Sequence, residues 1–357
     1  MPKTIFVVDD NDTNLATAEL ALEEQYQVMT LPSAAAMFEL LEEIIPDLIL
    51  LDIEMPVMDG FEALRRLKGH EEYADIPVVF LTSVVDASVE ARGFEMGVTD
   101  FVAKPFSAPV LQNRIMSHLS IEDLIRERTA ELERLRNGLV FILADIVENR
   151  DKATGGHIER TSEYVRILTG EMMARGIYAD EIGALNLETF TSAARLHDVG
   201  KLAIPDTILN KLGALTLEEF EMVKTHTVAG ERIIDKVLAR IGDLAFLHNA
   251  KLFAGSHHER WDGSGYPRGL KEMNIPIQGR ILAVADLYDA LLSDRPYYKK
   301  AFTEQEVISL ILDNAGKMFD PLIVEAFSGV KERFSEILHT YVHEGPVLHD
   351  GIAHKKA

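Results

Sequence analysis

Histidine and aspartate residues gather in five short segments of the C-terminal two thirds of the chain. They form one His-Asp pair, one His-His pair and three single residues: His157, His197-Asp198, His226, His257-His258 and Asp286. A lone histidine is usually a core residue, but adjacent pairs in glycine-flanked segments favour metal ligands. Imidazoles and carboxylates bind iron, manganese, zinc and similar first-row ions. Seven ligands suit two ions bridged by a carboxylate, a pair that activates water in phosphodiester hydrolysis.

A second set of residues that could bind ligands or react lies within residues 1–119. Asp9-Asp10 and Asp52 follow or end apolar runs, Thr82 closes another run, and Lys104 follows the last. Carboxylates that converge at one edge of a sheet repel one another, and Mg²⁺ would relieve that repulsion. A hydroxyl and an ammonium beside them suit a phosphoryl group carried on a carboxylate. The set therefore predicts a phosphoacceptor site.

The elements that must position these residues differ between the two parts. The first part has apolar runs separated by amphipathic stretches, at Ile5–Val8, Gln27–Leu31, Leu48–Leu51, Val78–Leu81 and Phe101–Val102. Such alternation predicts a doubly wound parallel α/β sheet with its ligand site at the carboxyl ends of the strands. After residue 140 only helical patterns appear, including one over Leu217–Asp235. That part is predicted to be all-α.

A heptad pattern joins the two parts. Apolar residues recur at alternating spacings of four and three with one polar interruption: Ile121, Ile125, Arg128, Leu132, Leu135, Leu139, Ile142 and Ile146. This pattern predicts a parallel coiled-coil linker that forms a homodimer and transmits a signal. The alternative is a single helix whose stripe packs on its own domain.

Composition excludes several classes of protein. The chain has 357 residues, more than one domain needs, and a net charge of −22. Because nucleic-acid affinity depends on Lys and Arg, polymeric nucleic acid is not an expected partner. There is no cysteine, which excludes thiolate ligands and nucleophiles. No signal peptide or membrane span is recognisable, so we expect a cytoplasmic protein without membrane insertion.

Residues 1–119 resemble the receiver domain of two-component response regulators, on the strand-end residues and their spacing. The resemblance implies that Asp52 is the phosphoacceptor, that Asp9, Asp10 and Asp52 bind Mg²⁺, and that a sensor histidine kinase is the partner. It also implies that Thr82 and Lys104 contact the phosphoryl group and that Phe101 is the switch aromatic.

Residues from about 140 to 330 resemble the HD-GYP subgroup of the HD phosphohydrolase superfamily. Members of this subgroup are phosphodiesterases that linearise cyclic di-GMP to pGpG and sometimes continue to GMP. The motifs HDVGK and HHERWDGSGYP carry the resemblance. It implies that the seven His and Asp residues are metal ligands, with Asp198 bridging. Lys201 would contact a phosphate or donate a proton. The other implied substrate-binding residues are Gly265, Tyr266, Pro267, Asp289, Arg295 and Lys299.

Three positions depart from the HD-GYP pattern. Ala153 stands where some members have a glutamate that helps hold a third metal, so two metal ions are expected. Tyr298 stands at the usual lysine with Lys299 after it, and Leu292 replaces a common threonine.

The sequence thus predicts a flavodoxin-like α/β receiver domain (1–119), a helical linker (120–145), an all-α HD-type phosphohydrolase domain (146–335) and a tail (336–357). We expect phosphorylation of Asp52 to control a metal-dependent phosphodiesterase that acts on cyclic di-GMP. Two alternatives stay open: a catalytically weak cyclic di-GMP sensor that acts through protein partners, and a hydrolase of another cyclic dinucleotide or of pGpG.

Overall fold

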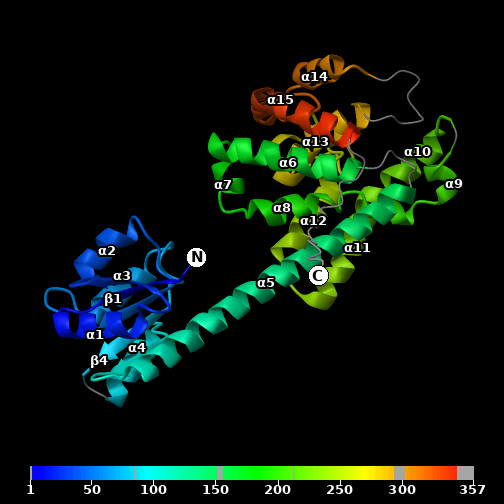
Figure 1. Ribbon diagram of the computed structural model, residues 1–357. Coiled ribbons are helices and arrows are strands. Elements are labelled where there is room, and N and C mark those ends of the chain that lie inside the picture. The colour runs from blue at the N-terminus through cyan, green and yellow to red at the C-terminus, as the bar shows by residue number, and fades with distance from the viewer. Residues whose placement is uncertain (1, 84–85, 151–155, 212, 293–301, 344–357) are drawn as a thin grey trace, which may run out of the picture. The chain divides into compact units, whose positions relative to one another are not determined.

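The computed structural model describes residues 2–83, 86–150, 156–211, 213–292 and 302–343 (Figure 1). The chain divides into two compact units, Met1–Leu132 and Glu133–Ala357. Each unit has its own hydrophobic core.

The first unit contains a five-stranded parallel sheet with the strand order β2-β1-β3-β4-β5. Its strands are β1 (Thr4–Val8), β2 (Gln27–Leu31), β3 (Leu48–Asp52), β4 (Val78–Thr82) and β5 (Asp100–Ala103). The buried residues of β3 and β4 are almost all apolar because both faces of the sheet are covered. The predicted doubly wound α/β fold is confirmed.

Helices cover both faces of this sheet: α1 (Asp12–Leu22), α2 (Ala34–Leu41), α3 (Gly60–Lys68), α4 (Ala87–Glu95) and the first turns of α5 (Ala108–Arg150). α1 and α5 pack on the face that holds Ile5 and Val7, whereas α2 and α3 pack on the face that holds Phe6 and Val8. Each of α1 to α4 begins after a polar residue whose side chain accepts backbone N–H bonds: Asn11, Ser33, Asp59 and Asp86.

The strand register brings the predicted phosphoacceptor residues to one edge of the sheet. Val8 pairs with Leu51, so that Asp9 and Asp52 follow at the same level. Asp52 pairs with Leu81, and Thr82 pairs with Ala103 next to Lys104. The carboxyl ends of four strands therefore meet as expected.

The predicted linker is part of one continuous helix, α5, which also includes the last helix of the first unit (Figure 1). Its C-terminal part carries two different apolar faces. Val140, Ala144 and Val147 are buried, and Val140 belongs to the core of the second unit. The seven apolar residues of the heptad stripe are each more than half exposed: Ile121, Ile125, Leu132, Leu135, Leu139, Ile142 and Ile146. The alternative in which this stripe packs on its own domain is therefore wrong.

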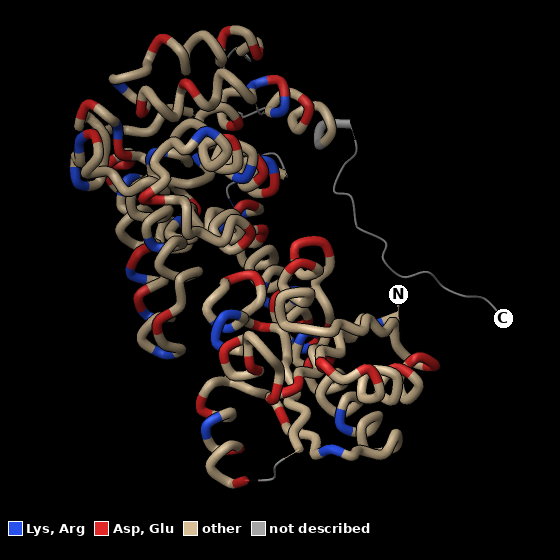
Figure 2. The backbone as a smooth tube through the Cα atoms, turned by 90° about the vertical axis from the view of Figure 1, so that its left-hand side faces the viewer, with Lys and Arg blue, Asp and Glu red and all other residues tan. Residues whose placement is uncertain are grey.

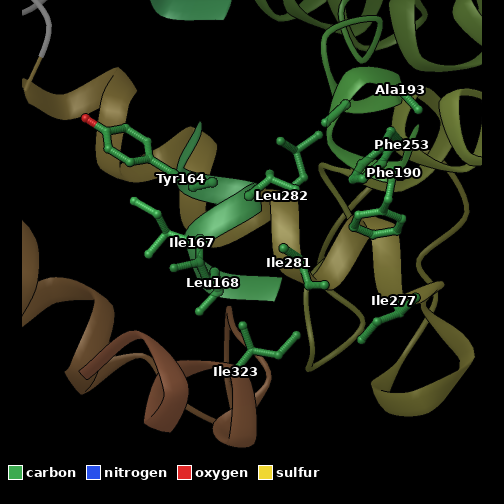
Figure 3. Packing of buried hydrophobic residues seen from close by; sticks show 14 of the residues in the cluster. Tyr164, Ile167, Leu168, Phe190, Ala193, Phe253, Ile277, Ile281, Leu282 and Ile323 are labelled. Atoms are coloured by element: carbon green, nitrogen blue, oxygen red, sulfur yellow. The ribbon is translucent and has the colours of Figure 1, made fainter. Parts of the chain in front are cut away.

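The second unit is helical. Its elements are α6 (His157–Ala174), α7 (Ala179–Ile182), α8 (Leu187–Ala194), η1 (Val199–Ala203), α9 (Asp206–Leu209), α10 (Leu217–Lys224), α11 (His226–Ile241), α12 (Ala245–Ser256), η2 (Glu272–Asn274), α13 (Ile277–Leu292), α14 (Glu304–Asp313) and α15 (Pro321–His343). Side chains from α6, α8, α12, α13 and α15 interdigitate in the core, including Tyr164, Phe190, Phe253, Ile281 and Ile323 (Figure 3).

Two local features of the fold concern the site, and the first differs from the sequence-based expectation. The helix predicted over Leu217–Asp235 is two helices, α10 and α11, and His226 is the first residue of α11. The Thr225 hydroxyl donates to the carbonyl of Met222 at 2.6 Å, a bond that competes with regular helix formation. After Asp198 the chain forms the short 3-10 helix η1 rather than a further turn of α8.

Candidate functional site

The first unit has an acidic cluster at the carboxyl edge of its sheet. Oxygen atoms of Asp9, Asp10 and Asp52 lie within 4.8 Å of one another. Asp9 and Asp52 are buried, whereas Asp10 is exposed. In the first unit as a whole, Asp and Glu residues outnumber Lys and Arg residues (Figure 2). Carboxylate oxygens of this kind suit a hard dication such as Mg²⁺.

Lys104 neutralises part of this charge. Its Nζ lies 2.6 Å from Asp9 Oδ2 and 2.7 Å from Asp52 Oδ1. Burial raises the pKa of Asp52, and the hydrogen bond and charge of Lys104 oppose that rise. Thr82 is also buried, at the end of β4 beside these groups.

The ring of Phe101 is buried against Phe80 and Phe94, with ring centroids 5.6 and 5.1 Å away. A glycine at position 93 makes this inward position possible. A Cβ atom at Gly93 would lie 2.4 Å from Phe101 Cζ. The aromatic predicted as a switch therefore occupies a space that one glycine on α4 provides.

In the second unit the predicted ligands form two adjacent groups. The first consists of His157, His197 and Asp198, and the second of His226, His257 and His258. Within each group the potential ligand atoms lie within 4.8 Å of one another. The ligands come from the starts of α6 and α11, the segment between α8 and η1, and the end of α12.

Asp198 stands between the two groups. Its Oδ2 lies 3.5 Å from His197 Nε2, and its Oδ1 lies 3.4 Å from His226 Nε2 and 3.8 Å from His257 Nε2. Burial alone would raise the pKa of Asp198, but the ammonium charge of Lys201 opposes that rise, and the pKa lies well below its usual range. One ionised carboxylate thus offers an oxygen atom to each group.

Two further predicted residues lie beside these groups. Lys201 Nζ is 2.8 Å from Asp198 Oδ2, since the tight turn of η1 brings it back over that carboxylate. Asp286 on α13 approaches the first group, with Oδ1 3.5 Å from His157 Nε2. The structure therefore brings all seven predicted ligands and Lys201 together.

Close backbone packing fixes this arrangement. A Cβ atom at Gly200 would lie 1.8 Å from the carbonyl oxygen of His226. Only glycine allows η1 to lie this close to α11. The contact holds Asp198 beside His226 and explains the glycine in the HDVGK motif.

The histidine rings are oriented by hydrogen bonds at Nδ1. His197, His226 and His257 each place Nδ1 near a carbonyl oxygen one turn earlier, at 2.9, 2.7 and 2.9 Å. With Nδ1 as donor, Nε2 carries a lone pair directed toward the group. Burial lowers the pKa of His257 to about 3, so this ring is neutral. Neutral imidazole is the form that binds metal.

Two ring nitrogens in the first group lack a hydrogen-bond partner among the described residues. These buried atoms are Nε2 of His157 and Nε2 of His197. Unpartnered buried polar atoms are rare in folded proteins and require an explanation. Metal ions would supply the missing partners, so the residues present fit the metals that the sequence predicts.

Asp289 does not lie where a substrate contact was expected. Its carboxylate is fully buried behind His157, with Oδ2 2.7 Å from His157 Nδ1. It also pairs with the buried Arg160, whose Nε lies 2.7 Å from Oδ1. Burial would raise the pKa of Asp289, but His157 and Arg160 lower it to about 2. In this structure Asp289 therefore orients the ring of His157 and is not open to solvent.

The GYP loop lies against the second group. The ring of Tyr266 packs on His258, with centroids 4.7 Å apart, and Lys224 Nζ lies 5.5 Å from the Tyr266 ring centre. The Tyr266-Pro267 peptide bond is cis. Gly265 has no room for a side chain, since a Cβ atom would lie 2.3 Å from the backbone nitrogen of Arg260.

Some predicted residues fall outside the described part of the chain. These are Arg295, Lys299, Tyr298 and Ala153. Two functional neighbours were not predicted. Arg160 could have been found because it lies three residues after His157, on the same face of a helix. Glu148, which hydrogen bonds to the backbone of His157, gave no such signal.

Comparison with known proteins assigns both units. The family model of the response regulator receiver domain matches residues 5–116, and the model of the HD domain matches residues 142–323. The chain belongs to the family of response regulators in which a receiver domain is followed by an HD domain.

Three relatives match this chain over most of their own length. A "Probable cyclic di-GMP phosphodiesterase" of Vibrio cholerae is 37% identical, over 96% of this chain and 80% of the relative. A "Cyclic di-GMP phosphodiesterase" of Thermotoga maritima is 32% identical, over 99% and 97%. The "Cyclic di-GMP phosphodiesterase response regulator RpfG" of Xanthomonas campestris is 36% identical, over 82% and 77%.

No described helix is both long and apolar enough to cross a lipid bilayer.

Proposed function

We propose that the protein is a phosphorylation-controlled response regulator whose HD domain hydrolyses cyclic di-GMP to pGpG, or further to GMP. The observation that carries this proposal is the position of Asp198, one oxygen of which faces each of two histidine groups. The names of the relatives support cyclic di-GMP as the substrate. The receiver domain would comprise residues 1–119, the linker 120–145 and the hydrolase 146–335.

The residues of the second unit have distinct roles in this proposal. His157, His197, Asp198 and Asp286 would hold one divalent first-row ion, such as iron or manganese, and Asp198, His226, His257 and His258 a second. When bound, such ions supply Lewis acidity and activate water for phosphodiester hydrolysis.

Lys201 and Tyr266 would act on the substrate. The Lys201 ammonium, 2.8 Å from Asp198, is placed to neutralise a phosphate oxygen or to give a proton to the leaving 3′ oxygen. The partly buried GYP loop, with Gly265, Tyr266 and Pro267, would line the substrate site. Tyr266 offers an aromatic face for a guanine base, since bases stack on aromatic rings. Arg295 and Lys299 stay proposed phosphate contacts.

In the receiver domain Asp52 would accept a phosphoryl group from a sensor histidine kinase. Asp9, Asp10 and Asp52 would hold Mg²⁺, and Thr82 and Lys104 would contact the phosphoryl oxygens. The short distance from Lys104 Nζ to Asp52 supports this arrangement. Phe101 would change position between the two states.

The test uses the purified full-length protein loaded with Mn²⁺ or Fe²⁺. We expect cyclic di-GMP to be hydrolysed to pGpG, with a rate that changes when beryllium trifluoride, a phosphoryl mimic, is added. The same mimic should have no effect on the Asp52→Asn variant. Bound cyclic di-GMP without product over hours would indicate a sensor instead, and faster turnover of another cyclic dinucleotide or of pGpG would change the assigned substrate.

We also propose that α5 forms a parallel coiled coil with a second copy of the chain. The exposed heptad stripe supports this, because a 3.5-residue repeat is the pattern that pairs two helices. Changing Leu132 and Leu139 to lysine places charges in the seam and is expected to convert dimer into monomer in sedimentation velocity. Glu133→Lys, an exposed α5 residue outside the stripe, is the control. A wild-type protein that is monomeric at micromolar concentration would contradict the proposal.

A further inference from the structure

Glu148 is a buried carboxylate near the C-terminal end of α5, with 7% of its surface exposed. Its Oε1 accepts the backbone N–H of His157 at 2.9 Å, and its Oε2 accepts that of Ile158 at 3.3 Å. In the described part of the chain its hydrogen bonds go to the start of α6. Glu148 is neither a proposed metal ligand nor a proposed substrate contact.

The first backbone N–H groups of α6 need hydrogen-bond acceptors from outside the helix. The first N–H groups of a helix have no acceptor within the helix, and a side chain at the preceding residue usually supplies one. Here that residue is Gly156, which has a positive φ of 89° and no side chain to offer. Glu148 takes this role from another helix, and its negative charge also suits the helix N-terminus.

His157 is therefore held at two points. Glu148 fixes its backbone, and Asp289 fixes its ring through Nδ1 at 2.7 Å. Together these bonds set where His157 Nε2 points, which is toward His197 and Asp198. A displacement of Glu148 would move one ligand of the first group. Among the described residues, the second group, at the start of α11 and just after α12, shares no hydrogen bond with Glu148.

The C-terminal end of α5 also bonds to the segment that follows η1. Arg150 donates to the carbonyl of Ile204 at 3.3 Å and pairs with Asp206 at 2.7 Å. These residues follow η1, the element that begins after Asp198. The last turns of α5 thus contact the segments next to His157 and next to η1, and α5 itself begins in the receiver unit.

We infer that Glu148 is a positioning residue through which the placement of α5 sets the position of His157, and so the metal affinity of the first group. This inference rests on the proposed function, because it names a means by which the state of the receiver reaches the hydrolase. It assigns the coupling to a hydrogen-bonded contact between α5 and α6.

The first test measures metal binding by the metal-free full-length protein, titrated with Mn²⁺ without substrate. Glu148→Gln keeps the size and one acceptor but loses the charge and the second bond. We expect about tenfold to hundredfold weaker binding at one of two sites, the range found when a partner of a ligand is changed. The other site should keep its affinity. The control is Thr303→Ala, which removes the side-chain cap of α14.

A merely structural role predicts a different result. Glu148→Gln and Thr303→Ala would then both lower the melting temperature and leave two unchanged Mn²⁺ affinities, which would overturn the inference. Because the titration contains no nucleotide, it is independent of the substrate. If wild type fails to hydrolyse cyclic di-GMP while Glu148→Gln loses one metal, the proposed function is wrong and the inference stands.

The second test measures the response to the receiver. The ratio of hydrolysis rates with and without beryllium trifluoride should fall toward one in Glu148→Gln, whatever its absolute rate. Thr303→Ala should keep the wild-type ratio. A wild-type ratio in Glu148→Gln would show that α5 acts on the site by another route.

Discussion

Replacing Asp198 by asparagine is expected to lower the rate of cyclic di-GMP hydrolysis by at least about a thousandfold. The carboxylate of Asp198 is ionised and offers one oxygen to each histidine group. Asparagine keeps the size but presents an amide NH₂ at one of these positions, which cannot bind a metal ion. Lys201 also loses the charge that holds it at 2.8 Å.

The measurement is the turnover rate together with the metal content per chain. Both should fall in Asp198→Asn, whereas the melting curve of the receiver domain should not change. Asp243→Asn is the matched control, because the Asp243 side chain is 88% exposed and pairs with a surface histidine. An Asp198→Asn protein with two bound metal ions and wild-type turnover would remove the basis of the proposed function.

Asp289→Asn is expected to lower the free energy of unfolding of the second unit by about 3–5 kcal/mol. The substitution removes the carboxylate charge that pairs with the buried guanidinium of Arg160, and both side chains are at most 5% exposed. The cost is large because this guanidinium has been removed from water. It also frees the ring of His157, so the metal affinity of the first group should fall with stability.

A second buried Asp–Arg pair separates these two effects. Asp320 is 1% exposed and lies 3.0 Å from Arg280, away from the histidine groups. Asp320→Asn should also destabilise the unit in urea unfolding, by less because Arg280 keeps its ion pair with Glu181, but it should leave metal affinity unchanged. If the two variants lost metal equally, the special role of Asp289 would be wrong.

The receiver site was predictable because its residues follow strands. An apolar run of four or five residues indicates a buried strand, and the residue after it lies at a defined edge of a parallel sheet. Asp9, Asp52, Thr82 and Lys104 could thus be placed together from the sequence alone. The seven predicted ligands of the second unit, which the structure brings together, could be selected by their residue types and by the paired motifs.

The residues that support the ligands were not predictable in the same way. Asp289 lies 132 positions from His157, and no pattern along the chain indicates that their side chains meet. Because burial is a property of the folded chain, the contact of Asp289 with His157 could not be derived from the sequence. The heptad stripe lies on the exposed face of α5, but the spacing of Val140, Ala144 and Val147 on its other face did not indicate that these residues are buried.

The Nε2 atoms of His157 and His197, which are buried without a hydrogen-bond partner in the described part of the chain, also affect the stability of the domain. An unpartnered buried polar group costs about 1–3 kcal/mol, so the metal-free domain carries this cost in its folded state alone. A ligand that binds only the folded state stabilises it by an amount that grows with the logarithm of the free ligand concentration. Metal binding would therefore stabilise the folded domain, and the proposed ions would raise its melting temperature as well as activate water.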